Sequence, residues 1–377
     1  MMTYPLEETP CTRIPASEID KTFTPISIDL ISSRFSGKVI CASDEWFAEA
    51  TNLVTATPPI PGNGKVVYTG GWYDGWETRR HNQMEFDYAI VKLGPDIRQN
   101  GGGLVCGVEI DTAFFNGNEA PAISVEGFAP SEGGVMSDED EKRMDENVTG
   151  WKHGKGEWQT ILCKQTCGPS RRQAWLLNTP TSRPYTYVRL NMYPDGGIAR
   201  FRLYGNSAMQ NFSTTDPNRA LDLAAAVNGG RCVGCSNEHY AKTSNLLLPG
   251  RGTDVSDGWE TRRSREPGHT DWVIVRLGAP SKLHTLVVDT AHFRGNFPQK
   301  CQVYGIDWTG KSGEPGDAEP GWADITGIQE CKGHWEHEYA VPSSTGQISH
   351  VKLVIIPDGG VKRVRAFGIP STHSARL

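Results

Sequence analysis

The pattern of hydrophobic and polar positions repeats in the two halves of the chain. An apolar run rich in aromatic and β-branched residues covers 86–94, and a matching run covers 270–278; both end on glycine. Such runs are typical of β-strands. A second pair, at 108–118 and 287–296, begins as a strand and passes into a polar loop of the kind that often carries binding residues.

A third shared block closes each half. Pro-Asp-Gly-Gly lies between apolar runs at 194–197 and 357–360, where proline fixes φ and the glycines accept positive φ. We interpret Asp195 and Asp358 as turn formers. The following strand alternates charged and apolar positions, so its arginines are predicted either to line a pocket or to form a solvated face. These arginines are Arg200, Arg202, Arg363 and Arg365.

Short strands, frequent turns and no alternation of strands with helices predict an all-β protein of two tandem jelly-roll β-sandwich domains produced by an internal duplication. One helix is expected between the repeats, capped by Asp216 and ended by Gly229, and the acidic stretch 131–147 is expected to be a mobile surface loop. The expected organisation is an N-terminal lead-in (1–38), the first repeat (39–205), a linker with the short helix (206–230), the second repeat (231–369) and a C-terminal tail (370–377).

Composition narrows the class of protein. A length of 377 residues suits two domains, and 37% hydrophobic with 22% charged residues is typical of a globular protein in water. A net charge of −6 argues against nucleic-acid and anionic-membrane partners, and no apolar run reaches the ~20 residues that a membrane span needs. Nine irregularly spaced cysteines and an acidic N-terminus without an apolar core favour reduced thiols inside a cell.

The candidate chemistry centres on an identical heptapeptide. Asp-Gly-Trp-Glu-Thr-Arg-Arg occurs at 74–80 and again at 257–263. Adjacent arginines can hold a carboxylate through planar, bidentate hydrogen bonds, and Glu77 and Glu260 can transfer protons or hold the arginines. The structural alternative is a salt-bridged turn repeated by descent.

Histidines and cysteines give weaker signals. Cys232 and Cys235 have a CxxC spacing without the second pair that a zinc site needs. The stretch 334–338, His-Trp-Glu-His-Glu, offers metal ligands but has no obvious counterpart in the first repeat. His81 aligns with Ser264, so a reaction that depends on this histidine would make the two sites differ or leave one inactive. The same holds for His292, which aligns with a phenylalanine.

The residues at 43–47, 72–82, 109–118 and 193–205 resemble the allantoicases (allantoate amidinohydrolases), and the resemblance runs from about 25 to 369. It implies two tandem jelly rolls similar to galactose-binding modules and a homo-oligomer, a hexamer or trimer of dimers. It also implies hydrolysis of allantoate to ureidoglycolate and urea in purine breakdown.

This reaction needs a carboxylate clamp, partners for ureido groups, and an acid and a base. On the matched motifs, the expected catalytic residues are Glu77, His81, Asp111, Glu260, Asp289 and His292. The expected substrate-binding residues are Arg79, Arg80, Asn116, Asn118, Arg262, Arg263, Arg294 and Asn296.

Two other functions stay open from the sequence. One is a related hydrolase acting on ureidoglycolate, and the other is a non-catalytic jelly roll that binds small anions or carbohydrate. Doubled arginines beside an acid favour a carboxylate substrate. No cofactor is expected, with manganese as the alternative. The expected location is the cytoplasm, or the peroxisome if Ala375-Arg376-Leu377 is read as an address.

Overall fold

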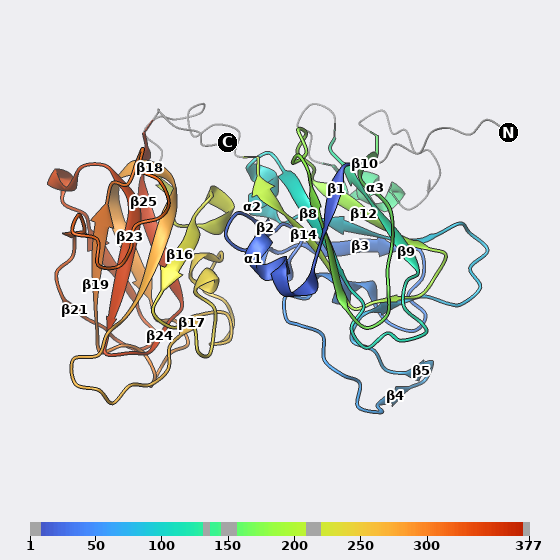
Figure 1. Ribbon diagram of the computed structural model, residues 1–377, viewed down its shortest axis with the longest axis horizontal. Coiled ribbons are helices and arrows are strands. Elements are labelled where there is room, and N and C mark those ends of the chain that lie inside the picture. The colour runs from blue at the N-terminus through green and yellow to red at the C-terminus, as the bar shows by residue number, and fades with distance from the viewer. Residues whose placement is uncertain (1–8, 131–135, 145–156, 209–219, 372–377) are drawn as a thin grey trace. The chain divides into compact units, whose positions relative to one another are not determined.

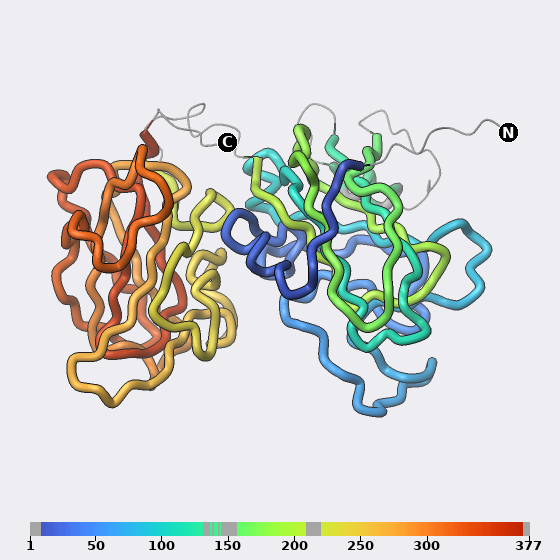
Figure 2. Tube along the Cα trace, in the orientation of Figure 1, coloured from blue at the N-terminus to red at the C-terminus, as the bar shows by residue number. Residues whose placement is uncertain are grey.

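The chain folds into two all-β units, as the sequence predicted. A computed structural model describes residues 9–130, 136–144, 157–208 and 220–371, and its two compact units divide after Met209. Figures 1 and 2 show each unit as a β-sandwich with loops at its ends. No helix among the described residues has the length and apolar character needed to cross a bilayer.

The first unit packs two antiparallel five-stranded sheets. One has the order β1-β11-β8-β14-β2: Cys11–Ile14, Arg172–Leu177, Gly103–Asp111, Arg200–Ser207 and Ile28–Asp29. The other has the order β10-β9-β12-β7-β3: Gln159–Thr166, Ala122–Phe128, Tyr187–Tyr193, Asp87–Lys92 and Lys38–Ala42. The expected lead-in is therefore largely structural, because β1, β2 and helix α1 (Ile19–Phe23) belong to this unit.

The second unit has the same architecture built around one long strand. Strand β18 (Asp271–Asp289) pairs in its first half with β16 (Arg231–Cys235) and β23 (Ile348–Ile356). In its second half it pairs with β22 (Glu336–Ala340) and β25 (Arg363–Pro370). Further strands are β15 (Leu221–Asp222), β19 (Lys300–Ile306), β20 (Ala323–Asp324) and β21 (Gln329–Glu330). In the first unit, the segment that corresponds to β18 is divided into two strands, β7 and β8, by helix α2 (Pro95–Gln99).

Small ribbons hold the repeated heptapeptide against the Pro-Asp-Gly-Gly turn. Strand β6 (Trp76–Glu77) pairs with β13 (Gly197–Ile198), and β17 (Trp259–Glu260) pairs with β24 (Gly360–Val361). The indoles of Trp76 and Trp259 are fully buried, so they are core residues that anchor the motif. The first unit also carries a hairpin, β4 (Val66–Val67) with β5 (Gly70–Gly71), on the long loop before its motif.

Two expectations about local structure were wrong. The predicted helix between the repeats is replaced over 221–228 by β15 and a short 3₁₀ turn, Ala226–Asn228. Here tertiary contacts outweigh helix propensity, because Leu223 and Ala224 are buried and the Asp222 carboxylate accepts backbone N–H bonds from Ala224 and Ala366. Residues 216–219 lie outside the described chain.

The acidic stretch is also more ordered than a surface loop. Helix α3 (Asp138–Arg143) begins at a Ser137 capping box. Met136 and Met144, on either side of it, pack in a core cluster with Tyr88 and Tyr187. Residues 131–135 and 145–147 lie outside the described chain.

Candidate active site

In each repeat, a hydrogen bond joins the glutamate of the heptapeptide to an asparagine from a separate loop, and the heptapeptide carries an arginine three residues after the glutamate. In the first repeat, Glu77 of β6 is 6% exposed, and its Oε1 accepts a 2.8 Å hydrogen bond from Asn118 Nδ2. Burial raises the pKa of the Glu77 carboxyl, while the Asn118 bond and the Arg80 charge lower it. We call Glu77, Asn118 and Arg80 the first triplet.

The second repeat forms the same asparagine–glutamate hydrogen bond, although Glu260 is only half-buried. Asn296 Nδ2 donates a 2.7 Å hydrogen bond to Glu260 Oε1, and Arg263 occupies the position of Arg80 in the heptapeptide. We call Glu260, Asn296 and Arg263 the second triplet. The sequence predicted these six residues but not the direct asparagine–glutamate bond, which only the folded loop reveals.

The two adjacent arginines of the first motif face different acids. Arg79 is bound to Asp44 through Nε at 2.6 Å and through its backbone N–H at 2.9 Å, and its guanidinium lies over the Trp46 ring. The charge of Arg80 instead lowers the pKa of Glu77. The expected joint grip of both arginines on one carboxylate therefore does not match this geometry, in which Arg79 already has an acid partner.

In the second repeat, the partner of the first arginine is neutral. Asn237 accepts the backbone N–H of Arg262 at 3.1 Å, just as Asp44 does for Arg79. In the first repeat, a cavity of about 520 Å³ lies next to Arg79 and is lined by Asp44, Trp46 and Tyr68.

The predicted aspartates shape the loops that follow β8 and β18. Asp111 and Asp289 each accept a 2.8 Å bond from a backbone N–H two residues on, that of Ala113 or Ala291. Burial raises the pKa of Asp111. Asp289 is 1% exposed and also binds Arg251 through two hydrogen bonds of 2.7 and 2.8 Å.

The remaining predicted residues are exposed or half-buried. His81 lies at the surface with φ of 64°. Asn116 is exposed, and its backbone N–H donates to Asn118 Oδ1 at 3.1 Å, which helps to orient that amide toward Glu77. Arg294 is exposed, and His292 is half-buried with its Nε2 3.2 Å from the Gly252 carbonyl.

Buried ion pairs hold the first residue of each heptapeptide in place. Arg200 and Arg363 are each 2% exposed, so they form neither a pocket wall nor a solvated face. Arg200 binds Asp74 at 2.8 Å, and Arg363 binds Asp257 at 2.7 Å. In the second repeat Asp257 also contacts the buried ammonium of Lys362. The first residue of each heptapeptide is therefore a structural anchor, as in the salt-bridged turn that the sequence left open as the alternative.

The aspartates that were predicted to form the Pro-Asp-Gly-Gly turns instead bind the segment that follows the heptapeptide. Asp195 accepts the backbone N–H of Asn82 at 3.1 Å, and Asp358 accepts that of Ser264 at 2.8 Å. Each turn thus holds the segment just beyond the heptapeptide against the Pro-Asp-Gly-Gly loop.

Metal ligation does not fit the donors present. Among the described residues, no three side chains of His, Cys, Asp or Glu come together in a way that could hold a metal ion. In the stretch 334–338, both ring nitrogens of His337 are occupied, by the Val288 carbonyl at 2.9 Å and the Lys332 N–H at 2.8 Å. This histidine is a structural residue.

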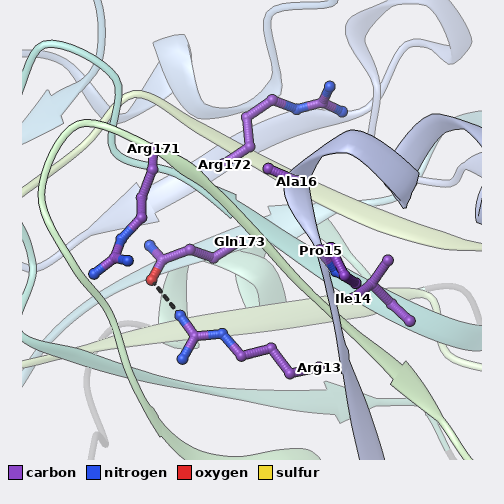
Figure 3. A pocket seen from close by; sticks show the side chains of 7 residues that line it. All are labelled: Arg13, Ile14, Pro15, Ala16, Arg171, Arg172 and Gln173. Atoms are coloured by element: carbon purple, nitrogen blue, oxygen red, sulfur yellow. Dashed lines mark hydrogen bonds between the residues drawn. The ribbon is translucent and has the colours of Figure 1, made fainter.

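A second cavity, of about 350 Å³, lies apart from these residues in the first unit (Figure 3). Arg13, Arg171, Arg172 and Gln173 line it, and Arg13 donates a 2.8 Å bond to Gln173. Arg172 is neutralised by Glu109. None of the sequence-predicted site residues lines this cavity.

The fold and the two triplets define a duplicated jelly-roll protein with the same polar group in each repeat. The allantoicase repeat matches the chain twice, over residues 28–208 and 221–371. The chain therefore belongs to the allantoicase family.

Full-length relatives agree. The chain is 53% identical to the allantoicase of Neurospora crassa over 364 residues, which cover 97% of each protein. It is 45% identical to the allantoicase of Saccharomyces cerevisiae over 91% of this chain and 94% of that one. The crystal structure of the S. cerevisiae allantoicase superposes with a TM-score of 0.75 at 41% identity, covering 95% of this chain and 99% of that chain.

Proposed function

We propose that the two triplets are where this hydrolase splits allantoate into ureidoglycolate and urea. The observation that carries the proposal is the buried Glu77, held by Asn118 and raised in pKa by burial, beside the Arg80 charge. An acid that keeps its proton more readily than an ordinary glutamate suits a reaction with a poor leaving group. The duplicated geometry at Glu260 supports the same role there.

Allantoate carries one carboxylate and two ureido groups on a single carbon, and one carbon–nitrogen bond must break. The protonated form of the Glu77 carboxyl, which burial favours, gives its proton to the nitrogen of the departing urea as that bond breaks. The resulting carboxylate then takes a proton from the water whose oxygen bonds to the central carbon. Glutamate ends protonated, and water has been added across the broken bond.

The polar neighbours supply binding and orientation. Arg80 and Arg263 suit the substrate carboxylate, because a guanidinium offers a planar pair of donors. Asn116, Asn118 and Asn296 have the amide groups that complement ureido N–H and C=O groups. Arg262 and Arg294 are exposed and add positive charge that attracts the anionic substrate. Asp111 and Asp289 hold the loops that carry these side chains.

Variants of the two glutamates test this proposal. Glu77→Gln and Glu260→Gln keep the shape and the amide bond but remove the transferable proton. We expect each to lower urea release from allantoate and the double variant to lower kcat by about 100-fold or more. Wild-type turnover in the double variant would overturn the proposal. The same assay with ureidoglycolate in place of allantoate shows which of the two substrates the enzyme prefers.

We propose that no resident metal takes part, because the described donors do not converge on a metal position. The test is urea release before and after EDTA treatment, with manganese added back. Loss of activity with EDTA and recovery with manganese would contradict the proposal.

We also propose a homo-oligomer of hexameric size. Three large apolar side chains stand exposed on the loop that bears the β4–β5 hairpin, namely Ile60, Val66 and Tyr68, with exposed fractions of 58%, 75% and 99%. Exposed apolar groups of this kind are typical of association surfaces. Light scattering should give a hexamer for the wild type and a smaller species for Val66→Lys/Tyr68→Lys. A monomeric wild type would contradict it.

The cytoplasm is the proposed location, with the peroxisome as the outcome if the C-terminal tripeptide is read. Ala375-Arg376-Leu377 lies outside the described residues. Fluorescent fusions with and without these three residues distinguish the two compartments.

A further inference from the structure

The loops after β8 and β18 have the same backbone but different side chains. Thr112 and Thr290 make equivalent hydroxyl bonds, to the carbonyls of Gly168 at 2.6 Å and Lys332 at 2.5 Å. The residue two positions after each threonine has φ of 69° in both repeats. That residue is an exposed phenylalanine in the first repeat and a histidine in the second.

The facing turns also correspond. Ser170 and His334 both have positive φ, and each donates its backbone N–H at 2.9 Å to the phenylalanine carbonyl of the loop opposite. The stretch 334–337 therefore does have a counterpart, Ser-Arg-Arg-Gln at 170–173, which the low sequence similarity had hidden. The two repeats share this scaffold, but the first has phenylalanine and serine where the second has His292 and His334.

Backbone hydrogen bonds fix the proton positions on the two imidazoles. The backbone N–H of His292 donates to His334 Nδ1 at 2.8 Å, so this nitrogen carries no proton and Nε2 presents an N–H. His292 Nε2 lies 3.2 Å from the Gly252 carbonyl, which can only accept, so Nε2 carries the proton of the neutral ring and Nδ1 of that tautomer presents a lone pair. The ring centroids are 5.4 Å apart. One imidazole therefore offers a donor and its neighbour offers an acceptor.

Charged groups of both signs surround the rings: Arg294, Arg251 and Asp289 act on His334, and Asp254 interacts with His292. Desolvation, followed by the charges of Arg294, His292 and Arg251, lowers the pKa of His334, which agrees with its neutral form. Arg251 is already bound to Asp289, whereas Arg294 has no ion pair with any acid in the described chain. Arg294 is thus available to a carboxylate.

We propose that His292 and His334 form a proton-transfer and ureido-binding pair that makes the second repeat chemically different from the first. The pair rests on the proposed function of the second triplet and adds a base to it. The loop 292–296 connects the two groups, because it begins at His292 and supplies Asn296 to Glu260 at its other end.

The roles follow from the tautomers. His292 Nδ1 takes a proton from water as the water oxygen bonds to the central carbon of allantoate. The carbon–nitrogen bond breaks, and the Glu260 carboxyl group gives a proton to the urea nitrogen. Solvent then returns the proton from the imidazolium to the carboxylate, so both groups are restored. His334 keeps its Nε2–H throughout and donates it to a ureido carbonyl.

The experiment isolates the second repeat in a Glu77→Gln background. His292→Gly fits the positive φ without strain and leaves a space for free imidazole. We expect kcat to fall by about 100-fold or more and added imidazole to restore part of it, a response that a structural role would not give. His334→Ser keeps an acceptor for the His292 N–H, as Ser170 does for Phe114 at 3.3 Å, and should mainly raise KM.

The matched control converts the first repeat instead. Phe114→His/Ser170→His uses the same backbone positions outside the proposed machinery and should leave turnover unchanged. Normal kcat in His292→Gly, or an inactive Glu77→Gln background, would overturn the imidazole pair. Wild-type turnover in Glu77→Gln/Glu260→Gln would instead overturn the proposed function of the triplets, so the two failures are distinguishable.

Discussion

Asn118 Nδ2 lies 2.8 Å from Glu77 Oε1, although the two residues are 41 positions apart in the sequence. Asn296 and Glu260 repeat this relationship at 2.7 Å. The bond favours the charged carboxylate, whereas burial of Glu77 disfavours it. The balance between the two effects sets how readily this acid gives up its proton.

Asn118→Leu in a Glu260→Gln background tests that balance. Removing the donor raises the pKa of Glu77 further, because the amide bond is one of the groups that lower it. We expect the pH profile of kcat/KM to shift toward higher pH and kcat to fall by about 10-fold or more. An unchanged pH profile would show that the amide does not tune this glutamate. Asn116→Leu, on the same exposed loop, is the matched comparison.

Two neighbouring arginines should respond differently to the same substitution. Arg80→Lys removes the planar fork beside Glu77 and should raise KM by about 10-fold or more. Arg79→Lys should have the smaller effect on KM, because Arg79 is held by Asp44. Steady-state kinetics in a Glu260→Gln background measure both. An equal increase in KM for both variants, or a larger one for Arg79→Lys, would support the sequence-based hypothesis that both arginines bind the substrate carboxylate.

The buried pair Asp74–Arg200 should matter for stability more than for chemistry. Asp74→Ala leaves a 2% exposed guanidinium without its acid, so we expect a loss of about 3–5 kcal/mol in the free energy of unfolding. Glu18→Gln breaks the exposed pair with Lys21 and should cost less than about 1 kcal/mol. Urea unfolding of the full chain compares the two. Similar small losses would contradict the buried-charge explanation.

Asp29 should give the first unit a pH-dependent stability. Burial raises its pKa to about 6, against the lowering effects of Arg202 and two backbone N–H bonds. An acid whose pKa is raised on folding stabilises the fold below its unfolded pKa, and that contribution disappears as pH rises through about 6. Asp29→Asn should therefore flatten the fall in unfolding free energy between about pH 4 and 6. Parallel stability curves for variant and wild type would refute this assignment.

Periodicity and repeated motifs predicted much of the architecture. The strand runs at 86–94 and 270–278 became β7 and the first half of β18, and the Pro-Asp-Gly-Gly turns lie where expected. Strand identity depends on local composition and alternation, which a sequence displays directly. The helix expected before Gly229 failed because its apolar residues are buried against β25 and the rest of the second unit, a contact that no local pattern reports.

The sequence by itself determined the duplication, the all-β class, the family resemblance and the glutamates, arginines and asparagines of the candidate site. Tertiary structure alone decided which of them meet: Asn118 reaches Glu77, Arg79 is bound to Asp44, and Arg200 is buried on Asp74. It also aligned Ser170 with His334 through shared backbone bonds where side chains had diverged. Residue identity fixes which groups are present, but hydrogen bonding and desolvation depend on distances between segments far apart in the chain.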